Sequence, residues 1–236
     1  MIKKIIIDND GNTYYYKSGD FSTKNGTIKE KDIQNGLVKT QLGKEFIVFD
    51  ANFIDNFTKI KRGPALMHPK DVGCIITTTG VGVGSKVVDA GTGQGGLSSF
   101  LARIGCKVTS YEKSPEFFEL SKNNISNLKL KVTLKNKDIY EGISEKNLDL
   151  ITLDLLEPWK VLDPAYKSLK SGGFLVAYLP TITQVIQLST NLDKNKFYLW
   201  KVSETIERKW YSDGLKVRPE NMILGHTAFI FFARKI

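Results

Sequence analysis

The sequence of 236 residues has few of the side chains that form disulfides and metal sites. Cys74 and Cys106 are its only cysteines, and their wide separation matches no metal-ligand spacing. Its two histidines, His68 and His226, are also too few and too far apart to suggest a metal centre. We therefore expect no bound metal and two cysteines that act as small buried apolar residues.

The sequence also lacks a long apolar run. No segment approaches the roughly 18 consecutive apolar residues that a membrane-spanning helix needs. Met1–Lys4 leads into charged sequence rather than into the apolar core of a signal peptide. With 41% hydrophobic and 25% charged residues, the composition is that of an ordinary globular protein. We expect a cytoplasmic protein without a membrane partner.

Acidic residues are fewer than basic ones, 25 against 34, which gives a formal net charge of +9. The excess is spread along the chain rather than gathered in one run. Such a charge suits a nucleic-acid substrate held through its phosphates, but many basic proteins bind no nucleic acid. Charge alone therefore does not decide the partner.

The most informative segment is 87–96, which reads VVDAGTGQGG. A β-branched run that ends in an acid and continues into spaced glycines is typical of a strand-to-helix loop that binds a nucleotide-like cofactor, because glycine lets a ligand approach backbone N–H groups. The spacing fits both the G-x-G-x-x-G pattern of dinucleotide sites and the acid-x-G-x-G-x-G pattern of S-adenosylmethionine (SAM) methyltransferases, through Asp89, Gly91, Gly93, Gly95 and Gly96. A glycine-rich turn without a ligand is a third interpretation.

The residues after the loop support a ligand site. Apolar residues recur at helical spacing from Leu97 to Ile104, which predicts a helix that the glycines open and that ends near Gly105. A strand over 107–111 then ends in Glu112, at the place where a doubly wound fold binds the two hydroxyls of a ribose. Both cofactor patterns predict an acid there, so Glu112 does not separate them.

The pattern of predicted secondary structure changes near residue 60. Residues 1–60 contain short β-rich runs separated by turn pairs such as Asp10-Gly11 and Asn25-Gly26, which predicts a small all-β domain of hairpins. After a linker over 61–64, residues 61–236 alternate predicted helices and strands. This alternation predicts an α/β domain whose mostly parallel sheet has helices on both faces and an antiparallel end.

The elements of the second domain are expected as follows. A helix begins at Pro69 and continues to about Thr79. Further helices are predicted near 116–126, 160–169 and 182–192, and further strands at 131–135, 148–154, 173–179, 197–205 and 227–234.

Four acids follow the predicted strands, namely Asp89, Glu112, Asp138 and Asp154. Ligands of open α/β sheets bind outside the carboxyl ends of the strands, so these acids should line one crevice. Four carboxylates would repel the pyrophosphate of NAD, whereas SAM carries a sulfonium and an ammonium and no phosphate. We therefore favour SAM over NAD as the cofactor.

Several separated motifs resemble the TrmI family of tRNA adenine-N1 methyltransferases and occur in the family's order over almost the whole chain. They are residues 89–96, 111–117, 154–159, 178–180 with Gln184, and 218–220 followed by 225–229, together with the entry His68-Pro69-Lys70-Asp71. The resemblance implies a class I SAM-dependent methyltransferase (Rossmann-like) fold, a homotetramer, and methylation of the adenine at position 58 in the T-loop of tRNA. The His68-Pro69 form is similar to archaeal members, for which position 57 is a second candidate.

The same resemblance implies roles for the cofactor residues. Glu112 would hold the ribose, Phe117 would pack near the adenine of SAM, and Asp138 would meet its amino group. The methionine end would lie against Gly91, Gly93, Gln94, Gly95, Gly96 and Leu97.

Adenine N1 is itself a nucleophile, so transfer from a sulfonium needs placement and charge handling rather than a metal. Asp154 is the candidate catalytic residue, because a carboxylate that accepts a hydrogen bond from N6 would orient the base and stabilise the positive charge that develops on the ring. A structural acid in a Pro-Trp turn is the alternative. His68 and Tyr178 are candidates for the wall of the base pocket, and Arg208 and Arg218 for phosphate contacts.

Two other functions stay open at this stage. One is a SAM methyltransferase that acts on a protein, as in isoaspartate repair, or on a small molecule. That function would not explain residues 1–60 or the excess of basic residues. A non-catalytic RNA-binding subunit would not need the glycine loop and the four acids, which are all present.

Overall fold

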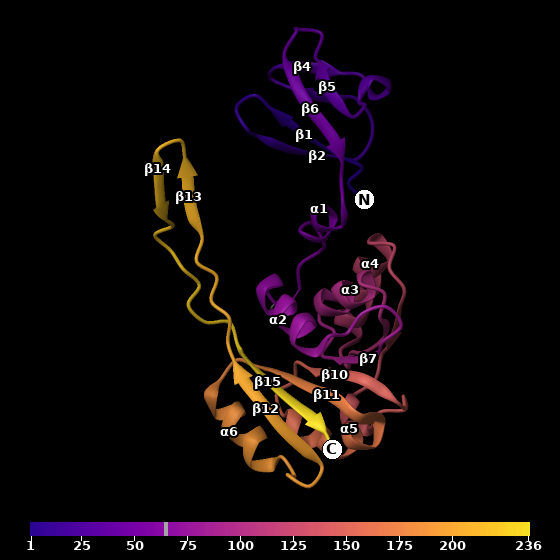
Figure 1. Cartoon of the computed structure of the whole chain (residues 1–236). Helices are drawn as coiled ribbons and strands as arrows, with labels where there is room; N and C mark the ends of the chain where they lie inside the picture. The colour runs from indigo at the N-terminus through magenta and orange to yellow at the C-terminus, as the bar shows by residue number, and fades with distance from the viewer. Residues whose placement is uncertain (64–65) are drawn as a thin grey trace. The chain divides into compact units, whose positions relative to one another are not determined.

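A computed structural model describes residues 1–63 and 66–236, and the chain divides into two compact units, Met1–Ile60 and Lys61–Ile236 (Figure 1). Pro64 of the expected linker lies outside the described residues. None of the helices in the described part of the chain is long and apolar enough to cross a membrane.

The first unit is built on a four-stranded antiparallel sheet of order β2-β1-β6-β5. Its buried centre contains Ile6, Ile28, Phe46 and Val48. The unit is not purely β as expected, because it also contains a short helix, α1, whose N-cap residue Asn52 forms a capping box with Asp55. Its elements are β1 (Lys4–Asp8), β2 (Thr13–Tyr16), β3 (Phe21–Thr23), β4 (Gly26–Ile28), η1 (Glu30–Asp32), β5 (Gly36–Lys39), β6 (Glu45–Asp50) and α1 (Phe53–Phe57).

The second unit contains a seven-stranded sheet of order β12-β15-β11-β10-β7-β8-β9. β15 runs antiparallel to both of its neighbours, as the sequence predicted for the end of the chain, and the other strands are parallel to one another. The strands are β7 (Lys86–Ala90), β8 (Lys107–Tyr111), β9 (Val132–Lys135), β10 (Leu148–Leu153), β11 (Leu169–Leu179), β12 (Phe197–Ser203) and β15 (Phe229–Lys235).

Helices cover both faces of this sheet (Figure 1). Because side chains alternate along a strand, Val87 packs under α2 and α3 while Val88 packs on the other face, toward α5 and α6. The helical elements are α2 (Pro69–Thr79), α3 (Gly96–Arg103), α4 (Pro115–Asn127), η2 (Ile139–Glu141), η3 (Pro158–Val161), α5 (Leu162–Ser168) and α6 (Ile182–Asn191).

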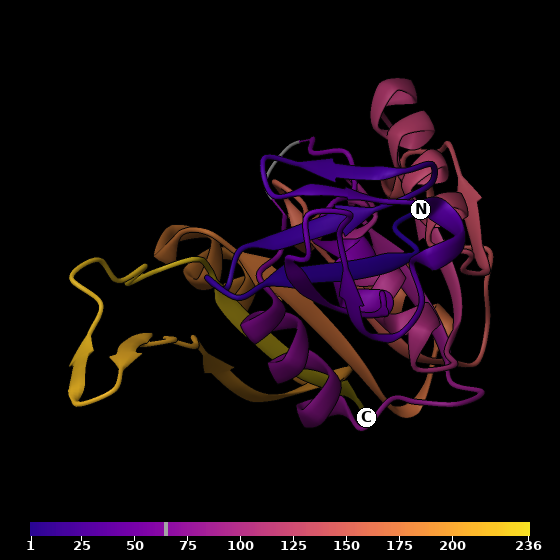
Figure 2. The same ribbon diagram turned by 90° about the horizontal axis from the view of Figure 1, so that it is seen from above.

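A hairpin that the sequence analysis did not predict stands away from the sheet (Figures 1 and 2). It consists of β13 (Trp210–Asp213) and β14 (Lys216–Pro219). Most of its side chains are exposed, including those of Trp210, Leu215 and Val217. The local signal for it was present, since Asp213-Gly214 is a frequent hairpin turn pair.

Candidate active site

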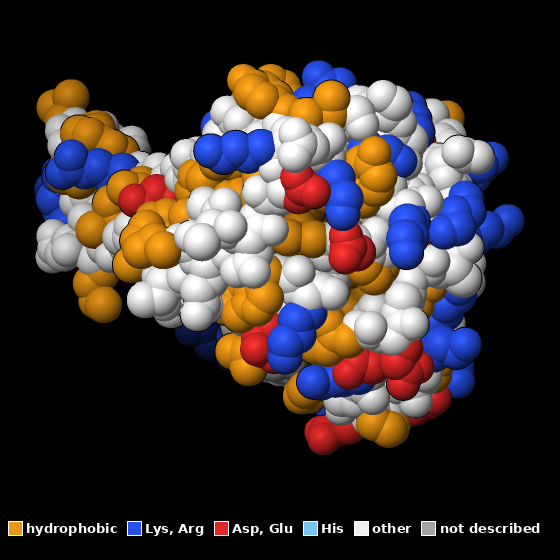
Figure 3. Space-filling model, turned by 90° about the horizontal axis from the view of Figure 1, so that it is seen from below, with side chains coloured by type: hydrophobic (Ala, Val, Ile, Leu, Met, Phe, Trp, Pro, Cys, Tyr) orange, Lys and Arg blue, Asp and Glu red, His pale blue; other side chains and the backbone are white. Residues whose placement is uncertain are grey.

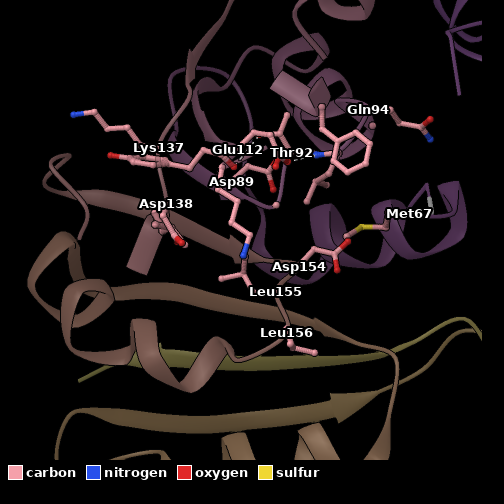
Figure 4. A pocket seen from close by; sticks show the side chains of 18 of the residues that line it. Met67, Asp89, Thr92, Gln94, Glu112, Lys137, Asp138, Asp154, Leu155 and Leu156 are labelled. Carbon is pink, nitrogen blue, oxygen red and sulfur yellow. Dashed lines mark hydrogen bonds between the residues drawn. The ribbon is translucent and has the colours of Figure 1, made fainter. Parts of the chain in front are cut away.

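A pocket of about 400 Å³ opens at the carboxyl ends of β7, β8 and β10 (Figure 4). From β7 the chain continues to β8 and β9 on one side, and β10 lies on the other side, so the pocket sits at the topological switch point where open α/β sheets bind ligands. All four strand-end acids, Asp89, Glu112, Asp138 and Asp154, line it, which confirms that they share one crevice.

The turn after β7 requires glycine at its first position. Gly91 has a φ of +86°, which other residues rarely adopt. A Cβ at this position would also overlap the backbone carbonyl of Asp154, which follows β10. The backbone N–H of Asp154 donates to the carbonyl of Ala90 at 2.9 Å. The ends of β7 and β10 are therefore locked together directly beneath the pocket.

Asp89 holds this region together through hydroxyl groups. It is buried, and its carboxylate accepts hydrogen bonds from Ser98, from Ser110 at 3.1 Å and from Thr152 at 2.7 Å. Burial raises the pKa of Asp89, although the three hydroxyls oppose the shift. Asp89 thus connects α3, β8 and β10, and its carboxylate already accepts hydrogen bonds from the protein itself.

Glu112 is bonded to the glycine loop that it faces. Its Oε2 accepts from the backbone N–H of Gly93 at 2.9 Å, and its Oε1 accepts from the N–H of Ser114 at 2.9 Å. Ser114 in turn caps α4. Glu112 and the neighbouring Thr92 lie on one side of the pocket, opposite Asp154, Leu155 and Leu156 (Figure 4).

Asp154 differs from the other acids because its carboxylate accepts no hydrogen bond from any described residue. The side chain reaches solvent at the mouth of the pocket. Burial among the surrounding protein atoms and the nearby Asp89 carboxylate together raise its pKa to about 7. A carboxylate in this state lacks a donor or cation and would gain free energy from a ligand that supplies one.

The loop that follows Asp154 is fixed from two sides. Gln184 Nε2 donates to the carbonyl of Leu156 at 3.1 Å, and the N–H of Glu157 donates to the hydroxyl of Tyr140 at 3.1 Å. Gln184 also forms a capping box with Thr181 at the start of α6. These contacts hold the rim of the pocket, from which Leu156 projects with 78% of its surface exposed.

Of the predicted cofactor residues, nearly all line the pocket. They are Gly91, Gly93, Gln94, Gly96, Leu97, Glu112, Phe117, Asp138 and Asp154. Gly95 does not line it. Gly95 is the N-cap residue of α3 with a φ of +86°, and a Cβ there would stand 3.1 Å from the Ile125 side chain of α4. Its lack of a side chain therefore serves the packing of α3 against α4. Asp138 accepts from the N–H of Tyr140 at 3.0 Å and so also begins η2.

Tyr178, expected in the wall of the base pocket, does not line this pocket. Its hydroxyl donates to the buried carboxylate of Asp71 at 2.9 Å, and Thr227 donates to the same carboxylate at 2.7 Å. Lys70 pairs with Asp71 at 2.8 Å and also donates to the carbonyl of Thr205 at 2.7 Å. The sequence analysis did not predict this cluster, because Tyr178, Thr205 and Thr227 each lie more than a hundred positions from Asp71.

The other three predicted substrate residues also lie outside the lining. His68 is exposed as the N-cap residue of α2, next to Met67, which does line the pocket. Arg208 and Arg218 belong to the projecting hairpin region, with their guanidinium carbons 5.9 Å from the Trp210 ring and 5.5 Å from the Tyr211 ring.

Sequence reasoning missed some of the lining, including Met67, Lys113, Lys137 and Tyr140. Two of these had a signal, since Lys113 and Lys137 are direct neighbours of the strand-end acids Glu112 and Asp138. Within the ranges 1–63 and 66–236, no group of histidine, cysteine or acidic side chains is arranged to hold a metal.

The strand order, the antiparallel β15 and the pocket at the switch point define the class I SAM-dependent methyltransferase fold. The family model described as "tRNA methyltransferase complex GCD14 subunit" matches residues 60–217, more than half of the chain. The chain belongs to this family, and the resemblance to TrmI enzymes is confirmed.

Three similar proteins illustrate the relationship. The chain is 32% identical to the tRNA (adenine(57)-N(1)/adenine(58)-N(1))-methyltransferase TrmI of Methanocaldococcus jannaschii, over 98% of this chain and 94% of the relative. A solved SAM-dependent O-methyltransferase from Thermotoga maritima superimposes with a TM-score of 0.85 and 29% identity, covering 100% and 93% of the two chains. The tRNA (m1A58) methyltransferase TrmI from Aquifex aeolicus gives 0.82 and 25%, covering 99% and 96%.

Proposed function

We propose that this chain is an enzyme that transfers the methyl group of SAM to N1 of adenine in the T-loop of tRNA, at position 58 and with position 57 as a second target. Membership of a tRNA methyltransferase family supports the class of substrate. The observation that carries the chemistry is the carboxylate of Asp154, which stands without a hydrogen-bond donor from the described residues beside the cofactor pocket.

The residues of the pocket fit SAM. The cavity of about 400 Å³ is of the size that binds a small organic cofactor. Its four acids suit the two positive charges of SAM, which supplies an electrophilic methyl group when bound. In this proposal the glycine loop and Leu97 surround the methionine end, Glu112 binds the ribose, and Phe117 and Asp138 contact the adenine of SAM.

Asp154 then acts on the substrate adenine. It accepts a hydrogen bond from the N6 amino group, which turns the N1 edge of the base toward the cofactor pocket. As N1 is methylated the ring becomes cationic and N6–H becomes a stronger donor, so the bond to Asp154 strengthens in the transition state. The exposed side chain of Leu156 offers an apolar rim against which a base turned out of the T-loop can pack.

The remaining assignments concern the rest of the tRNA. Arg208 and Arg218 contact phosphates from the projecting hairpin, and His68 borders the bound base from its exposed place beside Met67. Tyr178 supports the site indirectly, by fixing Asp71 at the start of α2. We further propose that the chain forms a homotetramer in the cytoplasm, in which residues 1–60 serve substrate binding or assembly and the apolar side chains of the hairpin become buried.

The test is nucleoside mass spectrometry of unmodified tRNA after incubation with the protein and SAM. The proposal predicts 1-methyladenosine as the product. The same assay with an isoaspartyl peptide should give no methyl ester. Methylation of the peptide without methylation of the tRNA would refute the proposal and favour a protein substrate on the same fold.

A further inference from the structure

A basic groove lies at the amino ends of β8 and β9, whereas the cofactor pocket lies at the carboxyl ends of the strands. It has a volume of about 810 Å³, and its lining includes Arg103, Lys107, Lys129 and Lys131 and no acidic residue. Lys107 begins β8, and Tyr111, which lines the cofactor pocket, ends it. The two residues are four positions apart along the strand, a distance of about 13 Å. The groove is therefore a different surface from the active site.

Three lysines at the amino ends of neighbouring strands, Lys86, Lys107 and Lys131, form a row, and the last two of them line the groove. Lys86 of β7 pairs with Lys107 of β8, and Val108 pairs with Val132 of β9, which places Lys131 beside Lys107. Neighbouring strands are about 4.8 Å apart. Like charges in directly adjacent positions destabilise a sheet, so this row has an energetic cost in the isolated protein.

Among the residues that the structure describes, acidic side chains reduce this cost only at one end of the row. Asp149, which precedes the β10 residue that pairs with Val87, lies beside Lys86 and forms an ion pair with Lys170. In the described part of the chain, no carboxylate lies within ion-pair distance of Lys107, Lys129 or Lys131. All three side chains are exposed.

Helix-end electrostatics account for part of the groove but not for the row. Arg103 is in the last turn of α3, and Lys129 follows the end of α4, where cations favour the negative end of the helix dipole. Lys107 and Lys131 are at the starts of strands, where no such effect applies. Lysine and arginine side chains also gather on the side of the molecule away from the projecting hairpin (Figure 3).

We propose that this groove binds the phosphodiester backbone of the tRNA substrate at a stretch remote from the methylated loop. The inference rests on the proposed function, because that function supplies a polyanion longer than the active site. Binding would release the condensed counterions of the RNA and would remove the repulsion within the lysine row at the same time. Lys107 and Lys131 are the central contacts, and Lys129 and Arg103 flank them.

The test compares the double variant Lys107→Gln/Lys131→Gln with a control, Lys167→Gln/Lys194→Gln. The control lysines are exposed, lie in the same unit, and have no carboxylate within ion-pair distance among the residues that the structure describes. Both variants lose two positive charges. Affinity for full-length tRNA and for an isolated T-stem-loop is measured at several salt concentrations, and SAM affinity by calorimetry.

We expect the groove variant to bind full-length tRNA roughly tenfold or more weakly at low salt, with a salt slope smaller by about 1.4 to 1.8. Its affinity for the T-stem-loop and for SAM should be unchanged, and its Tm at low salt should be higher than that of the wild type. The control should bind full-length tRNA as the wild type does.

Unchanged tRNA binding by the groove variant would overturn the inference. It would instead favour an acidic protein as the partner of the lysine row. Equal losses in both variants, or equal losses on both RNAs, would also overturn it, since either result indicates general attraction. Methylation of the same tRNA by the wild-type protein is followed in parallel. If the wild type methylates while the groove variant binds normally, only the groove inference fails; if the wild type does not methylate tRNA, the proposed function fails.

Discussion

The backbone carbonyl of Asp154 occupies the space that a Cβ atom on Gly91 would need. This contact joins the two strand ends that carry the glycine loop and the candidate catalytic carboxylate. Any side chain at position 91 therefore moves the glycine loop, the carboxylate or both. The requirement for glycine comes from the fold itself as well as from the approach of a ligand.

Gly91→Ala should weaken SAM binding strongly and destabilise the protein. The positive φ alone costs about 1–2 kcal/mol for a residue with a Cβ, and the displaced carbonyl adds to it. Calorimetry and urea unfolding measure the two effects. Gly73→Ala is the control, because Gly73 is an exposed residue of α2 with open space around it, and there we expect unchanged SAM binding and equal or higher stability. Equal effects of the two substitutions would contradict this account of the loop.

Asp154→Ala should leave SAM affinity nearly intact and lower the methylation rate by a factor on the order of 10² or more, which is the usual effect of losing a group that stabilises developing charge. Single-turnover methylation of tRNA measures the rate. Asp163→Asn, which removes an exposed acid of α5 paired with Lys196, should retain full activity. A rate unchanged by Asp154→Ala would assign Asp154 to structure.

The raised pKa of Asp154 predicts a pH-dependent stability. In the folded chain without ligand the carboxyl titrates near 7, and its ordinary value is 3.8. Between these values the folded state holds one more proton than the unfolded state, so the free energy of unfolding falls as pH rises from about 4 to about 7. Because the group reaches solvent, the amplitude should be well below that of a fully buried acid.

The non-titrating variant Asp154→Asn provides the comparison. Urea unfolding at several pH values should show this variant gaining stability relative to the wild type from pH 4 to 7, with a constant difference above pH 8. A difference that does not change with pH would rule out the raised pKa.

Asp71→Ala should lower the free energy of unfolding by about 3–5 kcal/mol, because it leaves the ammonium of Lys70 largely buried without a counterion. Burial alone would raise the pKa of Asp71, but Lys70 and the hydroxyls of Thr205, Thr227 and Tyr178 outweigh it and hold the pKa below 3.8. Tyr178→Phe should cost only about 1 kcal/mol, since it removes one of these hydrogen bonds. Urea midpoints give both numbers, and equal losses would show that the ion pair is not the main contribution.

Deletion of residues 1–60 should weaken tRNA binding or assembly more than SAM binding. The remaining unit, Lys61–Ile236, keeps both apolar clusters that pack the faces of its sheet. Calorimetry with SAM first verifies that the shortened chain folds, and tRNA binding is then measured against salt concentration. Identical tRNA affinity and identical activity of the two chains would contradict the role proposed for the first unit.

The sequence predicted local features of the fold well. The pattern of Leu97, Leu101 and Ile104 placed α3, and the acids at strand ends marked one pocket, because parallel strands end at the same edge of a sheet. Helix α2 begins at Pro69 and ends at Thr79 as expected. These features depend on short-range patterns that a single sequence contains.

Long-range partners could not be predicted in the same way. Nothing near Tyr178 in the sequence indicates that its hydroxyl donates a hydrogen bond to Asp71, because the interaction depends on how β11 and α2 pack in the fold. The β13–β14 hairpin was not predicted because its strands are exposed on both faces and lack the apolar alternation of a buried strand.

The central claim is that this protein methylates N1 of adenine in the T-loop of tRNA, at position 58 and with position 57 as a second target. Its most direct test is mass spectrometric mapping of methyl groups on full-length tRNA transcripts, with adenine or guanine at positions 57 and 58, after incubation with SAM and the wild-type protein. The account predicts 1-methyladenosine at position 58, none there when guanine replaces that adenine, and a trace at most from Asp154→Ala. Methyl groups on another atom or outside the T-loop, or a product that Asp154→Ala makes as fast as the wild type, would contradict it.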